Sequence, residues 1–298
     1  MSRIFEALQR ADLERKTSPV SEEDQAGEPV VISANDETPS PDSSISLESI
    51  SRHPWAPSLA SFPTLADRGA GVEQFRSLRS RIYQARYEAP VKTILISSGS
   101  PSEGKSFVAA NLAMCLVRNS ASSILLIDGD LRRPTLHTLL GAPGTPGLSE
   151  YLEGKVDLMD ILQRDHRPKP THLAAANTFS NLTFIPAGIC GDNSAELIAN
   201  HRIEELINAV SPLFDWILID SPPVLAVTDA VELAHAADAV LLIARVGSTT
   251  YPVAQSAQTA FTNSRILGFV LNDVKDPPSS GYGYYNHYVG HETGNLVK

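Results

Sequence analysis

The sequence has few cysteines, no long apolar run and fewer basic than acidic residues. Two cysteines in 298 residues, Cys115 and Cys190, form no disulfide framework, and Cys115 lies in an apolar helical pattern typical of a small core residue. No segment approaches the ~18 consecutive apolar residues that a membrane-spanning helix needs. The first 16 residues are too charged for the apolar core of a signal peptide. These absences predict a cytoplasmic protein.

The charge balance narrows the possible partners. Lysine and arginine number 24 against 34 aspartates and glutamates, which gives a formal net charge of -10. Such a balance argues against broad nucleic-acid binding, so we expect no nucleic-acid partner. The acidic excess is concentrated in residues 17–66, which hold eight acidic residues and one basic residue. The rest is mildly acidic, and a hydrophobic content of 42% is ample for a sizeable core.

Four segments are expected along the chain. Residues 1–16 place apolar side chains at helical spacing, which predicts a short amphipathic helix that needs a partner surface. Residues 17–66 are rich in Ser, Pro and acids, which is typical of a disordered linker. Residues 67–276 are expected to form the folded domain, and residues 277–298 a flexible, tyrosine-rich tail.

Strand-like apolar runs alternate with helical patterns from residue 91 onward. The runs are continuous, which predicts strands buried on both faces, and the helices between them predict parallel crossovers. The expected fold class is therefore α/β, with a doubly wound, mostly parallel sheet of the P-loop NTPase type. Ligands of such sheets bind at the carboxyl ends of the strands. The six runs are TILISS (93–98), SILLID (123–128), LTFIP (182–186), WILID (216–220), AVLLIA (239–244) and ILGFVLN (266–272).

A phosphate-binding loop follows the first of these runs. The stretch GSPSEGKS, residues 99–106, matches the P-loop pattern between a strand and a helix. Its glycines let backbone N–H groups wrap the phosphates, Lys105 reaches the β and γ oxygens, and Ser106 offers a hydroxyl to Mg²⁺. ATP and Mg²⁺ are the expected cofactors. The predicted nucleotide-binding residues are Gly99, Ser100, Pro101, Ser102, Glu103, Gly104, Lys105, Ser106 and Phe107.

Three aspartates stand at the ends of other runs. Asp128 and Asp130 end LLIDGD, and Asp220 ends WILID. Carboxylates at strand ends beside a phosphate loop are typical of a hydrated Mg²⁺ site. We expect Ser106, Asp128 and Asp220 to hold the metal, although any single aspartate in such a position is also a common helix cap.

These motifs together resemble those of the bacterial tyrosine kinases, a P-loop family that regulates capsule and exopolysaccharide export. The shared marks are Glu103 before the Gly-Lys pair, the apolar-Asp-x-Asp-x-Arg pattern of residues 125–132, and Asp-x-Pro-Pro from residue 220. The resemblance covers about residues 67–298, and Ser102 stands where many members carry glycine. It implies a protein-tyrosine kinase that transfers phosphate from ATP. The implied catalytic residues are Lys105, Asp128, Asp130, Arg132 and Asp220.

Four tyrosines crowd the end of the chain after the breaker sequence DPPSSG. Their spacing fits neither a helical nor a strand face, so we expect an exposed tail. Such a tail is long enough to enter the active site of an adjacent subunit. The resemblance makes these tyrosines phosphoacceptors that are modified in trans within an oligomer. They are Tyr282, Tyr284, Tyr285 and Tyr288.

The same resemblance implies partners. The stretch EQFRSLR places Glu73, Arg76 and Arg79 at the spacing by which family members associate into rings. The implied activator is a separate, membrane-embedded polysaccharide co-polymerase, which would recruit the protein to the inner face of the membrane. A phosphotyrosine phosphatase is the implied opposing enzyme. The implied role is regulation of capsular or exopolysaccharide polymerisation and export.

Several alternatives stay open at this point. Either Asp128 or Asp130 orients or deprotonates the phenol, and Arg132 either stabilises phosphate charge or anchors its loop. A ParA/MinD-like ATPase switch without kinase activity is the main alternative function, and an ATP-binding scaffold without turnover is another. Ser100 occupies the place of the signature lysine of segregation ATPases, and this difference favours the kinase, as do the tail tyrosines.

Overall fold

The structure, a computed structural model, describes residues 46–274 apart from residues 67, 120–121, 167–178, 180 and 192. The predicted helix of residues 1–16, the linker up to residue 45 and the tyrosine tail lie outside the described residues. Within the described ranges, no helix combines the length and the apolar character that crossing a bilayer requires.

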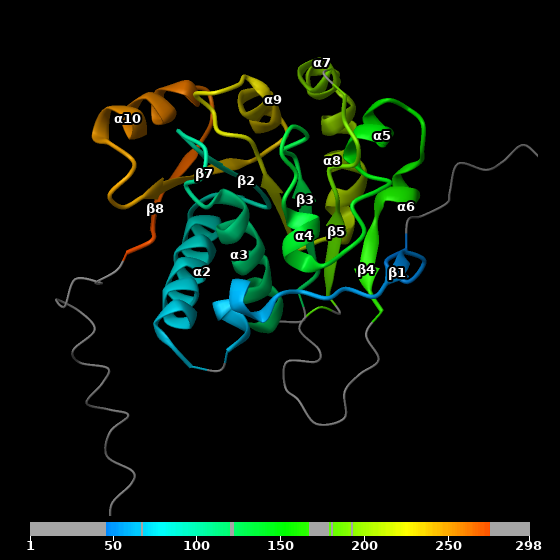
Figure 1. The fold of residues 1–298 in the computed structure, drawn as a ribbon, viewed down its shortest axis with the longest axis horizontal. Helices are drawn as coiled ribbons and strands as arrows, with labels where there is room; N and C mark the ends of the chain where they lie inside the picture. Colours follow the sequence, from blue (N-terminus) through cyan, green and yellow to red (C-terminus); the bar gives the residue numbers. More distant parts are fainter. Residues whose placement is uncertain are drawn as a thin grey trace, which may run out of the picture. The chain divides into compact units, whose positions relative to one another are not determined.

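One eight-stranded sheet runs through the molecule in the order β1-β4-β5-β3-β6-β2-β7-β8 (Figure 1). Neighbouring strands are parallel throughout, except that β4 pairs antiparallel with β5. The predicted α/β fold class is confirmed. The strands are β1 (Ser51–His53), β2 (Thr93–Ser98), β3 (Ile124–Asp128), β4 (Gln163–Asp165), β5 (Leu182–Ile185), β6 (Trp216–Asp220), β7 (Ala239–Arg245) and β8 (Ile266–Asn272).

The central strands form where the sequence has continuous apolar runs, because both of their faces are covered by helices. In β2, Ile94 and Ile96 enter one hydrophobic cluster, and Leu95 between them enters the other. This alternation follows from the two-residue period of a strand. The helices are α2 (Ala70–Glu88), α3 (Lys105–Asn119), α4 (Leu136–Leu140), α5 (Leu148–Leu152), α6 (Leu158–Ile161), α7 (Ser194–Ala199), α8 (Arg202–Val210), α9 (Asp229–His235) and α10 (Tyr251–Ala260), with 3-10 turns at Leu59–Ser61, Pro63–Leu65 and Ser211–Leu213.

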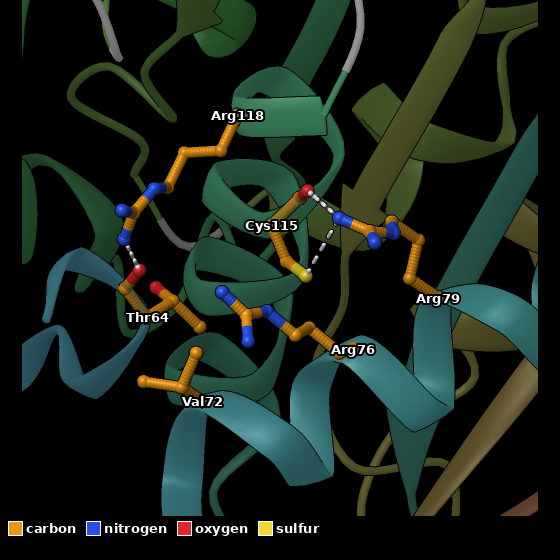
Figure 2. Close-up of a pocket in the computed structure, with 6 residues that line it drawn as sticks. All are labelled: Thr64, Val72, Arg76, Arg79, Cys115 and Arg118. Atoms are coloured by element: carbon orange, nitrogen blue, oxygen red, sulfur yellow. Dashed lines mark hydrogen bonds between the residues drawn. The ribbon is translucent and has the colours of Figure 1, made fainter. Parts of the chain in front are cut away.

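On one face of the sheet, α3 is buried between the strands and α2. Leu112 and Met114 of α3 are fully buried, and Phe75 of α2 packs on the same cluster. Arg79 of α2 reaches across to α3, where its Nη1 donates a hydrogen bond of 3.1 Å to the backbone oxygen of Cys115 (Figure 2). The helix that follows the phosphate loop is therefore fixed from both sides.

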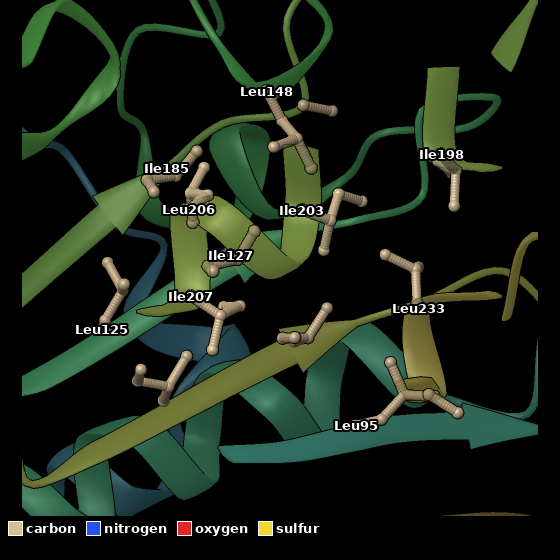
Figure 3. Packing of buried hydrophobic residues seen from close by; sticks show 14 of the residues in the cluster. Leu95, Leu125, Ile127, Leu148, Ile185, Ile198, Ile203, Leu206, Ile207 and Leu233 are labelled. Carbon is tan, nitrogen blue, oxygen red and sulfur yellow. The ribbon is translucent and has the colours of Figure 1, made fainter. Parts of the chain in front are cut away.

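The opposite face is covered mainly by α5 to α10, whose buried residues share one hydrophobic cluster with the strands. Leu206 and Ile207 of α8 pack toward Leu125 and Ile127 of β3, and Leu233 of α9 lies above Leu95 of β2 (Figure 3). Burial of each such side chain contributes roughly 1.5–3 kcal/mol relative to exposure. The two clusters together hold the carboxyl ends of β2, β3 and β6 in fixed positions.

The linker prediction for residues 17–66 is wrong over residues 46–66. This stretch forms β1 and two 3-10 turns, and Trp55 and Phe62 are buried. The Trp55 ring stacks edge-on against Phe184, with centroids 6.2 Å apart, and its backbone N–H donates to Asp165. The segment has no apolar periodicity, but large isolated aromatic residues bury enough surface to hold it on the domain.

Candidate active site

The phosphate loop lies between β2 and α3, as the motif predicts. In this loop Ser102 has a φ of 63° and Gly104 a φ of 94°. Glycine adopts such angles freely, whereas serine does not, so Ser102 occupies a conformation better suited to the glycine of many family members. At Gly104 an added Cβ would also collide with the side-chain amide of Asn272. Only glycine fits at residue 104.

Glu103 stabilises the loop from inside. Its side chain is buried, and Oε2 accepts a 2.8 Å hydrogen bond from the backbone N–H of Ser100. Its other oxygen accepts a hydrogen bond from the Thr249 hydroxyl. Glu103 therefore shapes the loop, and its carboxylate does not point toward solvent.

Lys105 begins α3 and is 7% exposed. Burial lowers the pKa of its ammonium below the ordinary value, and the nearby carboxylates of Asp220, Asp130 and Glu103 oppose this change. A cation that is largely shielded from water interacts strongly with any anion that approaches it. The position of Lys105 therefore suits it to bind phosphate oxygens.

Asp220 and Asp128 stand side by side at the ends of β6 and β3, where they are paired in register. Asp220 is completely buried, and this burial raises its pKa to about 7. The Ser106 hydroxyl and the Lys105 ammonium oppose the rise. No hydrogen bond of full geometry reaches either Asp220 oxygen within the described part of the chain. A buried carboxylate without such partners is a fitting ligand for a cation.

Asp128 differs from Asp220, because one of its carboxylate oxygens is hydrogen-bonded to the backbone. Oδ2 of Asp128 accepts hydrogen bonds from the backbone N–H groups of Thr135 and Leu136, at 3.1 and 3.0 Å. Burial, followed by the neighbouring Asp220, raises the pKa of Asp128 well above its usual range. In the described residues, no three His, Cys, Asp or Glu side chains are grouped closely enough to bind a metal by themselves.

The described residues could therefore supply some of the ligands of a metal ion, but not all of them. The Ser106 hydroxyl and the Asp220 carboxylate adjoin the phosphate loop, and their role as metal ligands stays a prediction. Phosphate oxygens and water would complete the coordination of Mg²⁺. Asp128 as a direct ligand stays a prediction, since one of its oxygens already binds the backbone before α4.

Asp130 is the more accessible of the two candidate bases. It is partly exposed, whereas Asp128 is fully buried. Burial raises the pKa of Asp130, while a backbone hydrogen bond from Arg133 and the charge of Lys105 lower it. Asp130 thus lies within the field of Lys105 and can be approached by another molecule.

Arg132 takes the anchoring position that the sequence left open. Its Nε and Nη2 bind the two carboxylate oxygens of Asp229 at 2.9 and 3.1 Å. Asp229 is buried at the start of α9, and no motif in the sequence points to this role. The bidentate pair holds the loop after β3 against α9. Contact of Arg132 with phosphate stays a prediction.

Helix α2 carries Glu73, Arg76 and Arg79. Arg76 pairs with Glu73 at 2.5 Å, and both side chains are about half exposed. Arg79 binds α3 as described above. With Arg118, the two arginines line a pocket of about 150 Å³ between α2 and α3 (Figure 2). Their predicted role in assembly is untested by a single chain.

Residues that sequence reasoning did not single out contact the loop from β7 and β8. Arg245 and Asn272 donate hydrogen bonds to the carbonyl oxygens of Ser102 and Glu103. The predicted phosphoacceptors Tyr282, Tyr284, Tyr285 and Tyr288 lie outside the described residues.

A phosphate loop with a buried lysine and strand-end aspartates on a parallel sheet defines a P-loop nucleotide-binding protein. A family model described as an AAA domain matches residues 91–264. The tyrosine-protein kinase YwqD of Bacillus subtilis (strain 168) is 34% identical over 215 residues, which cover 72% of this chain and 85% of YwqD. The chain belongs to the bacterial tyrosine-protein kinase family.

Solved structures agree with this assignment. The kinase domain of the Escherichia coli tyrosine kinase ETK has a TM-score of 0.65 and 29% identity, covering 74% of this chain and 83% of that domain. The septum site-determining protein MinD of Pyrococcus horikoshii, with a TM-score of 0.51, 23% identity and coverage of 64% of this chain and 76% of MinD, shares the fold only. Several curated tyrosine kinases are much longer, and the chain spans 27–29% of their length.

Proposed function

We propose that the protein is an ATP-dependent tyrosine autokinase that phosphorylates its C-terminal tyrosine cluster in trans within an oligomer. The observation that carries the proposal is the buried site itself, in a chain of this family. Lys105, Ser106 and the Asp220 carboxylate come together where β2 and β6 end. A phosphoryl group bound by the loop would meet positive charge on one side and metal ligands on the other.

The residues divide the work of phosphoryl transfer. Backbone N–H groups of residues 99–106 and the Lys105 ammonium bind the phosphates and offset the charge that develops on them. Ser106 and Asp220 would hold a Mg²⁺ ion, which would supply further positive charge for the phosphates. Asp130, partly exposed and close to Lys105, accepts or orients the phenol proton of the incoming tyrosine. Positioning matters more than full deprotonation, since a free phenol has a pKa near ~10.

The kinase is favoured over an ATPase switch by the tyrosine cluster and its point of departure. Tyr282 follows β8 by ten residues along the sequence, and the last residue of β8, Asn272, touches the phosphate loop. The C-terminal segment therefore starts beside the nucleotide site, and similar segments of neighbouring copies would start beside theirs. A nucleotide switch alone would not require tyrosines there.

A mixing experiment tests both the activity and its direction. One variant, Lys105→Met, keeps the tail but loses the phosphate-binding ammonium; a second lacks residues 282–298 but keeps the site. We expect neither to become phosphorylated on the tail when incubated alone with Mg·ATP. Mixed, the tail of the Lys105→Met protein is expected to become phosphorylated, as measured by mass spectrometry. Phosphate on Lys105→Met incubated alone would contradict the proposal.

The biological setting follows from the same family. We propose regulation of capsular or exopolysaccharide polymerisation and export, activation by a membrane-embedded polysaccharide co-polymerase, and reversal by a phosphotyrosine phosphatase. Binding of the kinase to such a co-polymerase would bring it to the inner face of the membrane. Pull-down with the cytoplasmic segments of a candidate co-polymerase, followed by measurement of tail phosphorylation, tests this part separately.

A further inference from the structure

Two strands on one side of the phosphate loop donate hydrogen bonds to its backbone. Arg245 ends β7, and its Nη1 donates to the carbonyl oxygen of Ser102 at 3.3 Å. Asn272 ends β8, and its Nδ2 donates to the carbonyl oxygen of Glu103 at 3.0 Å. Both acceptors lie in the part of the loop where Ser102 and Gly104 have positive φ angles.

This part of the loop needs outside support. Ser102 has a φ of 63°, a left-handed conformation that is unfavourable for any residue with a Cβ. Serine is held there by contacts, because its own preference is for the right-handed or extended regions. Arg245 binds the carbonyl of this same residue, and Asn272 binds the next one. The two side chains therefore act where the loop would otherwise relax.

Arg245 is itself held by the residue after β8. Its Nε and Nη2 bind the Oδ2 atom of Asp273 at 3.1 and 2.9 Å. Asp273 also has a positive φ, of 57°. One guanidinium thus joins the phosphate loop, the end of β7 and the first residue beyond β8, from which the chain continues toward the tyrosine cluster.

We propose that Arg245 and Asn272 are positioning residues of the nucleotide loop, and that the Arg245–Asp273 pair couples nucleotide binding to order at the end of β8. The role of these residues in nucleotide binding requires only that the P-loop binds a nucleotide. Any effect of this coupling on the tyrosine tail beyond β8 rests on the proposed kinase function. Coupling between two sites is reciprocal. A nucleotide that selects the wrapped loop stabilises the end of β8, and a fixed end of β8 favours nucleotide binding.

The first test removes the guanidinium. Arg245→Ala is expected to weaken Mg·ATP binding about five- to tenfold, measured by titration with a fluorescent ATP analogue, because it removes a charge-assisted contact at a partly exposed site. Arg265→Ala is the matched control, because Arg265 binds the carbonyl oxygens of Ala85 and Ala89 at the opposite end of β8. Unchanged affinity in Arg245→Ala, or an equal loss in Arg265→Ala, would overturn the proposal.

A second set of variants separates positioning from general destabilisation. Asp273→Ala is expected to weaken binding less than Arg245→Ala, and the double variant no more than Arg245→Ala alone, since Asp273 acts through Arg245. Arg245→Lys keeps the charge without the fork and is expected to recover part of the affinity. Additive losses in the double variant would show that Asp273 acts by another route.

Hydrogen–deuterium exchange provides the readout that a purely structural role would not change. In wild type, a non-hydrolysable ATP analogue is expected to slow exchange in residues 266–274, and in Arg245→Ala this protection is lost. No protection in wild type would overturn the coupling. If the tail of wild type is never phosphorylated while Arg245→Ala still weakens ATP binding, the kinase proposal fails and this inference stands.

Discussion

Burial places the Asp220 carboxylate under electrostatic strain, because it raises the pKa of this group to about 7. It is completely buried beside Asp128, and neither of its oxygens has a hydrogen bond of full geometry within the described ranges. A carboxylate in this situation is costly to ionise until a cation arrives. The strain is therefore consistent with a residue kept for its function and not for stability.

Asp220→Asn gives a pH prediction for the protein without metal or nucleotide. The pKa of Asp220 in the folded state, about 7, lies above its ordinary value of 3.8, so the folded state binds this proton more tightly. The free energy of unfolding of wild type then falls as pH rises from about 4 to about 7. The variant lacks this loss and is expected to be more stable than wild type at pH 8, on the order of a few kcal/mol. Urea unfolding in EDTA at pH 5 and pH 8 measures the difference in free energy of unfolding between the variant and wild type. An equal difference at both pH values would contradict the prediction.

Asp130 and Asp128 are expected to differ when each is changed to asparagine. Asp130→Asn removes the accessible base and is expected to slow tail phosphorylation by about 10²–10⁴-fold with little change in ATP affinity. Asp128→Asn disturbs the hydrogen bonds to residues 135 and 136 and is expected to lower stability as well. Single-turnover kinetics and urea unfolding on both variants check the distinction. A larger rate loss in Asp128→Asn, with stability intact, would reverse the assignment of the base.

The loop and the three aspartates could be predicted from the sequence, because a local motif or the end of an apolar run marks each of them. Arg245, Thr249 and Asn272 have no such local signal. Their contacts with the loop span 143, 146 and 169 residues of sequence. Only the order of strands in the sheet brings them to the loop, so they became visible in the structure alone.

The short, continuous apolar runs were sufficient to predict six strands, from β2 to β8 without β4. The two missed strands, β1 and β4, have the sequences SRH and QRD and lie toward one edge of the sheet. Short polar strands form because they pair with the free edge of a neighbouring strand. Their own sequences have no apolar pattern from which a strand could be predicted.

The segment of residues 46–66 is predicted to contribute to stability through its aromatic residues. Trp55→Ala empties a site enclosed by Phe179 and Phe184, and we expect it to lower the free energy of unfolding by about 3–5 kcal/mol. Tyr87→Ala removes an aromatic ring that is 95% exposed and is expected to change it by less than about 0.5 kcal/mol. Urea unfolding of both variants provides the comparison. Equal, small effects would show that residues 46–66 are not part of the folded unit.

Assembly of several copies and phosphorylation of the tail are expected to oppose each other. Each phosphate adds about -1.5 to -2 charges, so a tail with four phosphotyrosines would gain about -6 to -8. Charge of that size on neighbouring tails favours their separation. Helix α2 presents Arg76 and Arg79 as the residues through which copies are proposed to meet.

This gives a prediction for oligomer size. Unphosphorylated protein is expected to assemble, and protein phosphorylated on the tail is expected to fall apart, as measured by light scattering. The Arg76→Ala, Arg79→Ala double variant is expected to stay small in both states while keeping its circular dichroism spectrum. The same size for phosphorylated and unphosphorylated wild type would contradict the charge switch.

The most direct measurement is peptide mass spectrometry of the protein after incubation with Mg·ATP, with a candidate activator fragment present and Lys105→Met treated in parallel. We expect phosphate on one or more of Tyr282, Tyr284, Tyr285 and Tyr288 in wild type and none in the variant. An unmodified tail in wild type, with ATP demonstrably bound and the activator present, would contradict the proposed kinase activity and favour a nucleotide switch without it.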